Sequence, residues 1–239
     1  MLKVRLHQTR CVKRGNMNTK IELVIFDCDG VVIDSEILSA QVLINMLAEI
    51  GVNIDRAYVQ QYFLGCNFKT VTQNLFDTFN VTLAERFEAD YREALLNEFE
   101  TALMPTNGIK HVLEQLSVPC CIATSSSPKR TAKALNVVNL SQHFNNVFTS
   151  SEVKNGKPAP DLFLHAAEKM GVKPQNCLVI EDSKAGVCAA LAADMQVLHY
   201  SGGGHMQDAV NFVHQAYPDV AHLTHWDDFY KQYSALQTQ

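Results

Sequence analysis

The sequence predicts an α/β protein with a doubly wound parallel sheet and an inserted α-helical cap subdomain. Short apolar runs alternate along the chain with helix-length amphipathic segments. The runs are almost continuously apolar, which is typical of parallel strands covered by helices on both faces. This alternation favours a Rossmann-like sheet, and one long helical interval within it indicates the insertion.

The expected elements follow one another in regular order. Strands are predicted at residues 22–27, 119–124, 146–149, 177–181 and 195–200. Helices are predicted at residues 108–117, 128–136, 160–170 and 184–193. Proline is favoured in the first turn of a helix and glycine just after its end, so Pro160 and Gly171 bound the third of these helices.

The interval between the first two strands has helical periodicity and no convincing strand. One helical face is expected from Leu83, Phe87, Tyr91 and Leu95, with a capping box of Thr82 and Glu85 at its start. Because no single crossover helix needs that length, residues 37–103 are predicted to form a helical cap domain. Residues 21–36 and 104–239 are predicted to form the core domain, and residues 1–20 a flexible N-terminal extension.

Composition and charge narrow the function classes. The 239 residues are 47% hydrophobic and 19% charged, as in an ordinary globular protein. The net charge of −5 gives no electrostatic basis for binding nucleic acid or an anionic membrane. The cysteines number seven and form no CxxC pair, which favours reduced thiols and a cytoplasmic location.

Polar side chains gather at the ends of the predicted strands. They are Asp27 and Asp29 at the end of the first strand, Thr124, Ser125 and Ser126 at the second, Lys157 after the third, and Glu181 and Asp182 at the fourth. The carboxyl ends of parallel strands meet at one edge of a sheet, where open α/β proteins bind their ligands. We therefore expect one site.

The carboxylates at this edge predict a magnesium ion. Strand alternation sends Asp27 and Asp29 to the same side, and Gly30 then permits a turn with positive φ. Glu181 and Asp182 add further negative charge, which a hard cation is expected to balance. Mg²⁺ matches carboxylates that it shares with a phosphate.

The cation and hydroxyl at the same edge predict a site for a tetrahedral anion. Lys157 supplies a point charge and Thr124 a hydroxyl donor beside free loop amides. Competing motifs fail on spacing. The residues after Asp27 lack the acids of an EF-hand, NGK at 155–157 is not a P-loop, and no G-x-S-x-G elbow is present.

Four stretches in order carry a resemblance to a known family. DCDGVVIDSE, the strand end at Thr124, KPAPD and LVIEDSKAGVCAA resemble the motifs of the haloacid dehalogenase (HAD) superfamily of phosphohydrolases. The resemblance covers about residues 21–200 and matches the helical-cap branch with β-phosphoglucomutases and phosphatases of the 6-phosphogluconate type. It implies a Mg²⁺-dependent phosphatase that hydrolyses a small phosphorylated sugar or sugar acid through an aspartyl phosphate.

The resemblance also implies residue roles. Asp27 resembles the nucleophile, and Asp29 the acid that protonates the leaving group and then the base that activates water. Magnesium is implied on Asp27, Asp182 and the backbone carbonyl of Asp29, with Glu181 in support. The phosphoryl oxygens are implied to contact Thr124, Ser125, Ser126 and Lys157. The residues expected to select the substrate are Asn67 and Lys69 of the cap. The substrate is expected to be a small phosphorylated metabolite, and the protein is expected to be a monomer.

Two alternatives remain open. A phosphosugar mutase shares the first half of the chemistry, but β-phosphoglucomutases of this branch have a histidine where Ser39 stands and an arginine where Phe68 stands. A non-catalytic binding module is the other alternative. Among residues outside the motifs, Asp34 is expected to cap or shape the hinge to the insertion. The five histidines between residues 199 and 225 are expected to form a surface cluster.

Overall fold

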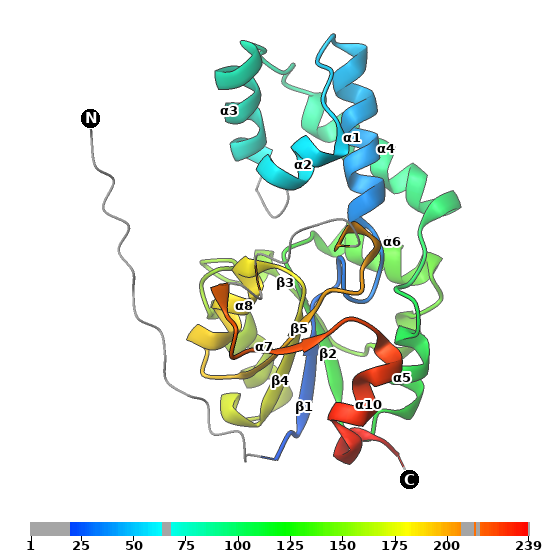
Figure 1. Cartoon of the computed structure of the whole chain (residues 1–239), viewed down its shortest axis with the longest axis vertical. Coiled ribbons are helices and arrows are strands. Elements are labelled where there is room, and N and C mark those ends of the chain that lie inside the picture. The colour runs from blue at the N-terminus through cyan, green and yellow to red at the C-terminus, as the bar shows by residue number, and fades with distance from the viewer. Residues whose placement is uncertain (1–19, 64–67, 207–212, 214–215, 239) are drawn as a thin grey trace, which may run out of the picture.

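The core of the protein is a parallel sheet of six strands in the order β3-β2-β1-β4-β5-β6 (Figure 1). The computed structural model describes residues 20–63, 68–206, 213 and 216–238. The strands are β1 (Leu23–Phe26), β2 (Cys120–Thr124), β3 (Val147–Thr149), β4 (Cys177–Glu181), β5 (Gln196–Tyr200) and β6 (Ala221–Leu223). Within these described ranges, no helix is both long and apolar enough to cross a bilayer.

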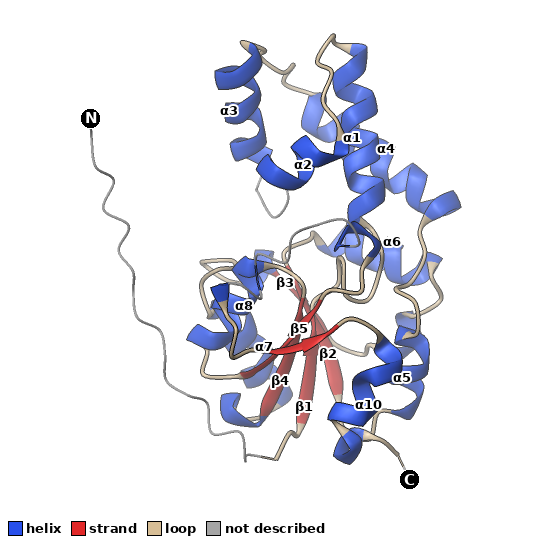
Figure 2. Ribbon diagram, in the orientation of Figure 1, coloured by secondary structure: helices blue, strands red, loops and turns tan. Residues whose placement is uncertain are grey.

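Helices cover both faces of the sheet, which confirms the doubly wound fold (Figure 2). Helices α7 (Asp161–Met170) and α8 (Lys184–Ala192) pack on one face around Leu23, Ile25 and Val179. Helices α5 (Ile109–Gln115), α6 (Pro128–Val137) and α10 (Phe229–Gln232) pack on the other around Val24 and Phe26. Successive residues of β1 thus enter opposite cores, as strand alternation requires.

The described residues of the insertion between β1 and β2 form four helices. They are α1 (Glu36–Glu49), α2 (Arg56–Tyr62), α3 (Phe68–Phe79) and α4 (Phe87–Ala102). These helices enclose their own apolar cluster, which includes Leu47, Leu75 and Phe87. Figure 1 shows them above the edge of the sheet at which β1 ends. The division into a cap at 37–103 and a core stays a prediction, and residues 1–19 lie outside the described residues.

Local expectations differ from the structure at two places. The capping box at Thr82 is wrong, because the chain is irregular there and α4 begins at Phe87 after Arg86. Strand β6 was not predicted, because Ala221–Leu223 has a polar residue at its centre and only Leu223 is buried. Short 3-10 turns complete the described fold: η1 (Ser141–His143), η2 (Ser150–Glu152), η3 (Pro174–Asn176), η4 (Gly204–Met206), η5 (Trp226–Asp228) and η6 (Ser234–Leu236).

Candidate active site

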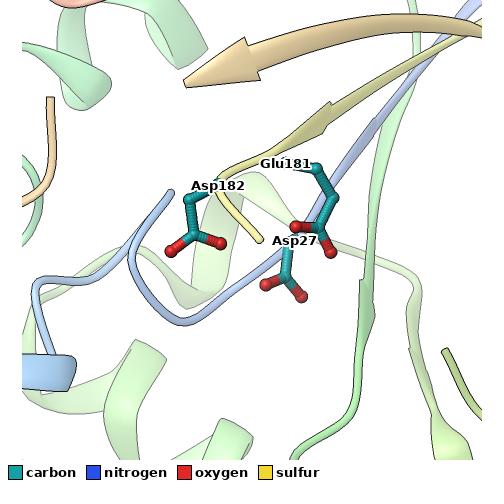
Figure 3. A group of neighbouring side chains, drawn as sticks. All are labelled: Asp27, Glu181 and Asp182. Carbon is teal, nitrogen blue, oxygen red and sulfur yellow. The ribbon is translucent and has the colours of Figure 1, made fainter. Parts of the chain in front are cut away.

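Three carboxylates meet where β1 and β4 end. Phe26 of β1 pairs with Ile180 of β4, so the next residue of each strand, Asp27 and Glu181, lie side by side. Asp182 follows directly, and one carboxylate oxygen from each of the three lies within 4.8 Å of the others (Figure 3). All three residues are buried, and we call them the acidic triad.

Lys157 is the cation that faces the acidic triad. Its Nζ donates to Asp27 Oδ1 and Glu181 Oε1, at 2.7 Å each, and to the carbonyl oxygen of Ala123 at 2.9 Å. Its side chain is only 4% exposed. The two carboxylates raise the pKa of Lys157 despite its burial, so the amine stays charged.

One lysine does not neutralise three buried carboxylates. Burial raises the pKa of Asp27 well above its ordinary range, although Lys157 opposes the shift. Burial also raises the pKa of Asp182, while a hydrogen bond from His205 opposes it. A divalent cation would remove this excess of negative charge, and a donor set made only of carboxylate oxygens fits Mg²⁺.

Two glycines allow the backbone to approach the acidic triad. A Cβ at Gly186, in the first turn of α8, would lie 1.7 Å from Glu181 Oε1. A Cβ at Gly30 would lie 2.0 Å from Asp182 Oδ2, and Gly30 also has a φ of +77°. The predicted turn at Gly30 is therefore confirmed, and any larger side chain at either position would displace a carboxylate.

Asp29 is held by a separate set of donors. Its carboxylate accepts hydrogen bonds from Ser35 Oγ, from Ser126 Oγ at 2.6 Å and from Arg130 Nη2 at 2.7 Å. Burial opposes ionisation here, but the charge of Arg130 and the two hydroxyl groups outweigh it and lower the pKa of Asp29. In this conformation Asp29 is an ionised carboxylate.

The structure therefore gives the two motif aspartates different partners. Asp27 contacts Lys157, whereas Asp29 contacts Arg130 and is not part of the acidic triad. The expectation from strand alternation assumed that the strand continues through Asp29. Because β1 ends at Phe26, the two-residue period does not extend that far.

The last residue of β2, Thr124, and the residues that follow it lie at the same edge. Thr124 is buried, and its Oγ1 accepts the backbone N–H of Ser126 at 3.1 Å. Ser125 is exposed, and its carbonyl oxygen accepts a hydrogen bond from Ser150 Oγ. Ser127 caps helix α6. The hydroxyl of Ser126, predicted to contact phosphate, donates to Asp29 Oδ2, and its contact with phosphate stays a prediction.

The cap residues predicted for specificity are only partly described. Lys69 lies in the first turn of α3 with its side chain exposed. Asn67 lies outside the described residues. Substrate recognition by this part of the cap stays a prediction.

Three residues that contact this site directly were not predicted as site residues: Ser35, Arg130 and His205. Arg130 gave no signal because only the fold brings α6 to Asp29. His205 was assigned to a surface cluster, but it is 5% exposed and its Nε2 lies 3.0 Å from Asp182 Oδ2. That assignment is also wrong for His199, which is 1% exposed: its ring stacks on His222 and its Nε2 lies 3.1 Å from the carbonyl oxygen of Asp182. His214 lies outside the described residues.

Glu36 offers a test of the electrostatics around Asp29. Burial, and then the charge of Asp29, raise the pKa of Glu36 from an ordinary 4.5 to about 7. Between pH 4.5 and about pH 7, Glu36 therefore keeps a proton in the folded protein that it has released in the unfolded chain. The free energy of unfolding falls as the pH rises through this range. We expect Glu36→Gln to remove this loss and to stabilise the protein by about 1–2 kcal/mol at pH 8 relative to pH 5.

Urea unfolding in EDTA at both pH values measures this difference. Glu49→Gln, at the exposed end of α1, is the matched control and should behave like the wild type. An equal effect of Glu36→Gln at pH 5 and pH 8 would contradict the raised pKa.

Comparisons with known proteins agree with this geometry. The model of the haloacid dehalogenase-like hydrolase family matches residues 24–200. The chain is 28% identical to 6-phosphogluconate phosphatase of Escherichia coli (strain K12), over 87% of this chain and 92% of that protein. It is 33% identical to a protein of Drosophila melanogaster named "Probable pseudouridine-5'-phosphatase", over 75% of this chain and 81% of that protein.

A solved structure shows the same architecture. A conserved haloacid dehalogenase-like protein of unknown function from Agrobacterium tumefaciens superposes with a TM-score of 0.80 and 30% identity, over 90% of this chain and 98% of that chain. The family match spans the sheet from β1 to β5, with the acidic triad, Lys157 and the insertion all inside it. The chain belongs to the haloacid dehalogenase-like hydrolase family.

Proposed function

We propose that this protein is a Mg²⁺-dependent phosphomonoesterase that acts on a small phosphorylated sugar or sugar acid through an aspartyl phosphate. The observation that carries the proposal is the contact of Asp27 with Lys157 beside Glu181 and Asp182, at the edge where an open α/β sheet binds its ligand. The carboxylate of Asp27 lies beside the buried ammonium of Lys157 and beside the proposed metal site. A carboxylate in such surroundings is positioned to attack a phosphoryl group.

In the first step Asp27 forms a bond to phosphorus and the ester P–O bond breaks. Asp29, in its protonated form, gives its proton to the departing alkoxide. In the second step the Asp29 carboxylate takes a proton from water, the water oxygen bonds to phosphorus, and the bond to Asp27 breaks to release phosphate. Lys157 and Thr124 are proposed to hold phosphoryl oxygens, and bound Mg²⁺ would stabilise the charge on the transferring group.

Proton delivery requires Asp29 to leave its present partners. Arg130 and two hydroxyl groups lower the pKa of Asp29 in this conformation, although burial opposes the shift, which makes the group a poor acid there. Arg130 also contacts Ser39 of α1 at 3.3 Å and lies over the ring of Phe99 of α4. These contacts connect the resting position of Asp29 to two helices of the insertion.

The substrate class rests on the relatives and on the insertion. The names of the two relatives reported above share a phosphorylated sugar unit, with a carboxylate in one case and a base in the other. Helices α1–α4 lie over the edge with the acidic triad, where a closing cap excludes water and contacts the leaving group (Figure 1). A monomer in the cytoplasm remains our expectation.

Lys69 is the proposed contact for an anionic or hydroxylated part of the substrate. We expect Lys69→Ala to raise KM by about tenfold for an anionic sugar acid phosphate while leaving kcat within about twofold, since a lost binding contact acts on both states alike. Steady-state kinetics measure this, with the exposed Lys173 changed to alanine as control. An unchanged KM for every substrate would remove Lys69 from the proposal.

The mutase alternative is less consistent with the side chains present. Ser39, where mutases of this branch have histidine, donates to the backbone of Ser35 and contacts Arg130. Phe68, where they have arginine, stacks on Tyr91 with ring centroids 5.8 Å apart. Neither residue offers the cationic contact that holds a second phosphate.

Phosphate release tests the proposal across phosphorylated sugars, sugar acids and nucleotides, with Mg²⁺ or with EDTA. We expect release only with Mg²⁺, fastest for a sugar or sugar acid phosphate. Isomerisation that depends on an added sugar bisphosphate, without net phosphate release, would favour the mutase. Binding of these compounds without turnover would favour a non-catalytic module.

A further inference from the structure

A glycine-rich turn after β5 is inserted between three parts of the molecule. This turn, residues 202–205 with the sequence GGGH, leaves no space for side chains at its three glycines. The Cβ positions at Gly202, Gly203 and Gly204 would lie 2.2 Å from Thr224 O, 2.8 Å from Gly30 O and 2.6 Å from Asp34 Oδ2, respectively. The turn therefore contacts the segment after β6, the turn that follows Asp27, and the start of the insertion.

His205 ends this turn and contacts the acidic triad. Its Nε2 lies 3.0 Å from Asp182 Oδ2, and its side chain is buried. Because Nε2 faces a carboxylate oxygen, this nitrogen carries the proton and donates it. The other nitrogen, Nδ1, is buried and has no hydrogen-bond partner among the described residues. The contact with Asp182 is thus the polar contact that orients the ring.

The same turn is bonded to the insertion at two points. Gln60 of α2 donates its side-chain N–H to the carbonyl oxygen of His205 at 2.6 Å. The backbone N–H of Gly204 donates to Asp34 Oδ1 at 3.0 Å, just before α1 begins. Asp34, expected to cap or shape the hinge, therefore binds this turn. A displacement of α2 would therefore move His205, the residue that contacts Asp182.

We propose that His205 is a positioning residue for the cation site, because it orients the carboxylate of Asp182. Gln60 binds the backbone of His205, so the contact between His205 and Asp182 depends on the position of the insertion. By its contact with Oδ2, the imidazole restricts rotation of the Asp182 carboxylate and so keeps it oriented beside Asp27 and Glu181. Hydrogen bonds to a ligating carboxylate commonly change metal affinity by about 10–100-fold. This inference rests on the proposed function, because it assumes that the acidic triad binds Mg²⁺.

Isothermal titration of the full chain with Mg²⁺, after removal of metal with EDTA, tests the role of His205. We expect His205→Ala to raise the Kd for Mg²⁺ by about 10–100-fold. His205→Gln, which retains an N–H donor of similar reach, should restore most of the affinity. His111→Ala, on the exposed face of α5, is the matched control and should leave the Kd unchanged.

Two further measurements separate positioning from other roles. Gln60→Ala should raise the Kd by a smaller factor of about 3–10, whereas Gln61→Ala on the exposed side of α2 should not. Electron spin-echo envelope modulation spectra of the protein loaded with Mn²⁺ should show no nitrogen bound directly to the metal ion, because His205 contacts Asp182 and not the ion. The Gln60 variant keeps the proposal testable if His205→Ala does not fold.

The outcomes that overturn this inference differ from those that overturn the proposed function. Wild-type affinity in the folded His205→Ala variant, no rescue by glutamine, or a nitrogen bound to Mn²⁺ would each contradict the positioning role. Absence of Mg²⁺ binding by the wild type would instead contradict the proposed function itself.

Discussion

Lys157→Met is expected to stop phosphate release and to destabilise the metal-free protein. The side chain of Lys157 is 4% exposed and donates to two carboxylates, so its removal leaves buried negative charges without their cation. Breaking a buried ion pair from one side costs about 3–5 kcal/mol. Loss of the charge that stabilises the phosphoryl group should lower kcat by at least about 10³-fold.

Urea unfolding in EDTA and in Mg²⁺ separates the two effects. We expect the free energy of unfolding to fall most in EDTA and to recover partly in Mg²⁺, because the metal ion neutralises the same carboxylates. Lys154→Met, an exposed lysine three residues earlier, is the matched control and should leave both quantities unchanged. Wild-type stability in EDTA together with retained turnover would show that Lys157 does not pair with the acidic triad.

Asp27→Asn is expected to abolish turnover without loss of stability. The amide cannot form the aspartyl phosphate, so kcat should fall by at least about 10³-fold. Burial raises the pKa of Asp27, which means that the charged form is disfavoured in the folded metal-free protein. A neutral asparagine removes that cost, and the free energy of unfolding in EDTA should not decrease.

Phosphate release and urea unfolding measure these two quantities on the same preparation. Asp77→Asn, at an exposed position of α3, serves as the control for the loss of one carboxylate. Turnover by a folded Asp27→Asn variant at a rate near that of the wild type would exclude Asp27 as the nucleophile.

The fold followed from the sequence because its signals are local. Near-continuous apolar runs identified five of the strands, and Pro160 and Gly171 marked helix ends that the structure places at Asp161 and Met170. The capping box at Thr82 failed for the same reason, because a local pattern does not show which turn the tertiary packing selects. Strand β6 was missed because Ala221–Leu223 contains a central histidine and only Leu223 is buried, so it lacks the apolar run that identified the equally short β3.

Only those residues of the candidate site that lie at the carboxyl ends of strands could be predicted from the sequence. Asp27, Glu181 and Asp182 follow paired strands, so the order of the sheet brings them together. Arg130 contacts Asp29 across 101 residues of sequence, and no local pattern indicates such a pair. His205 reaches Asp182 because a glycine turn fits between the core and the insertion, and its glycines gave no such indication before the fold was known.

The most direct measurement traps the phosphoryl group on the protein. Wild-type protein with Mg²⁺ and a ³²P-labelled sugar phosphate is quenched in acid, reduced with borohydride, and digested into peptides. We predict an acid-stable label and, after reduction, a homoserine at position 27, with neither in Asp27→Asn. Phosphate release without any labelled intermediate, or with label on another residue, would contradict an aspartyl phosphate at Asp27.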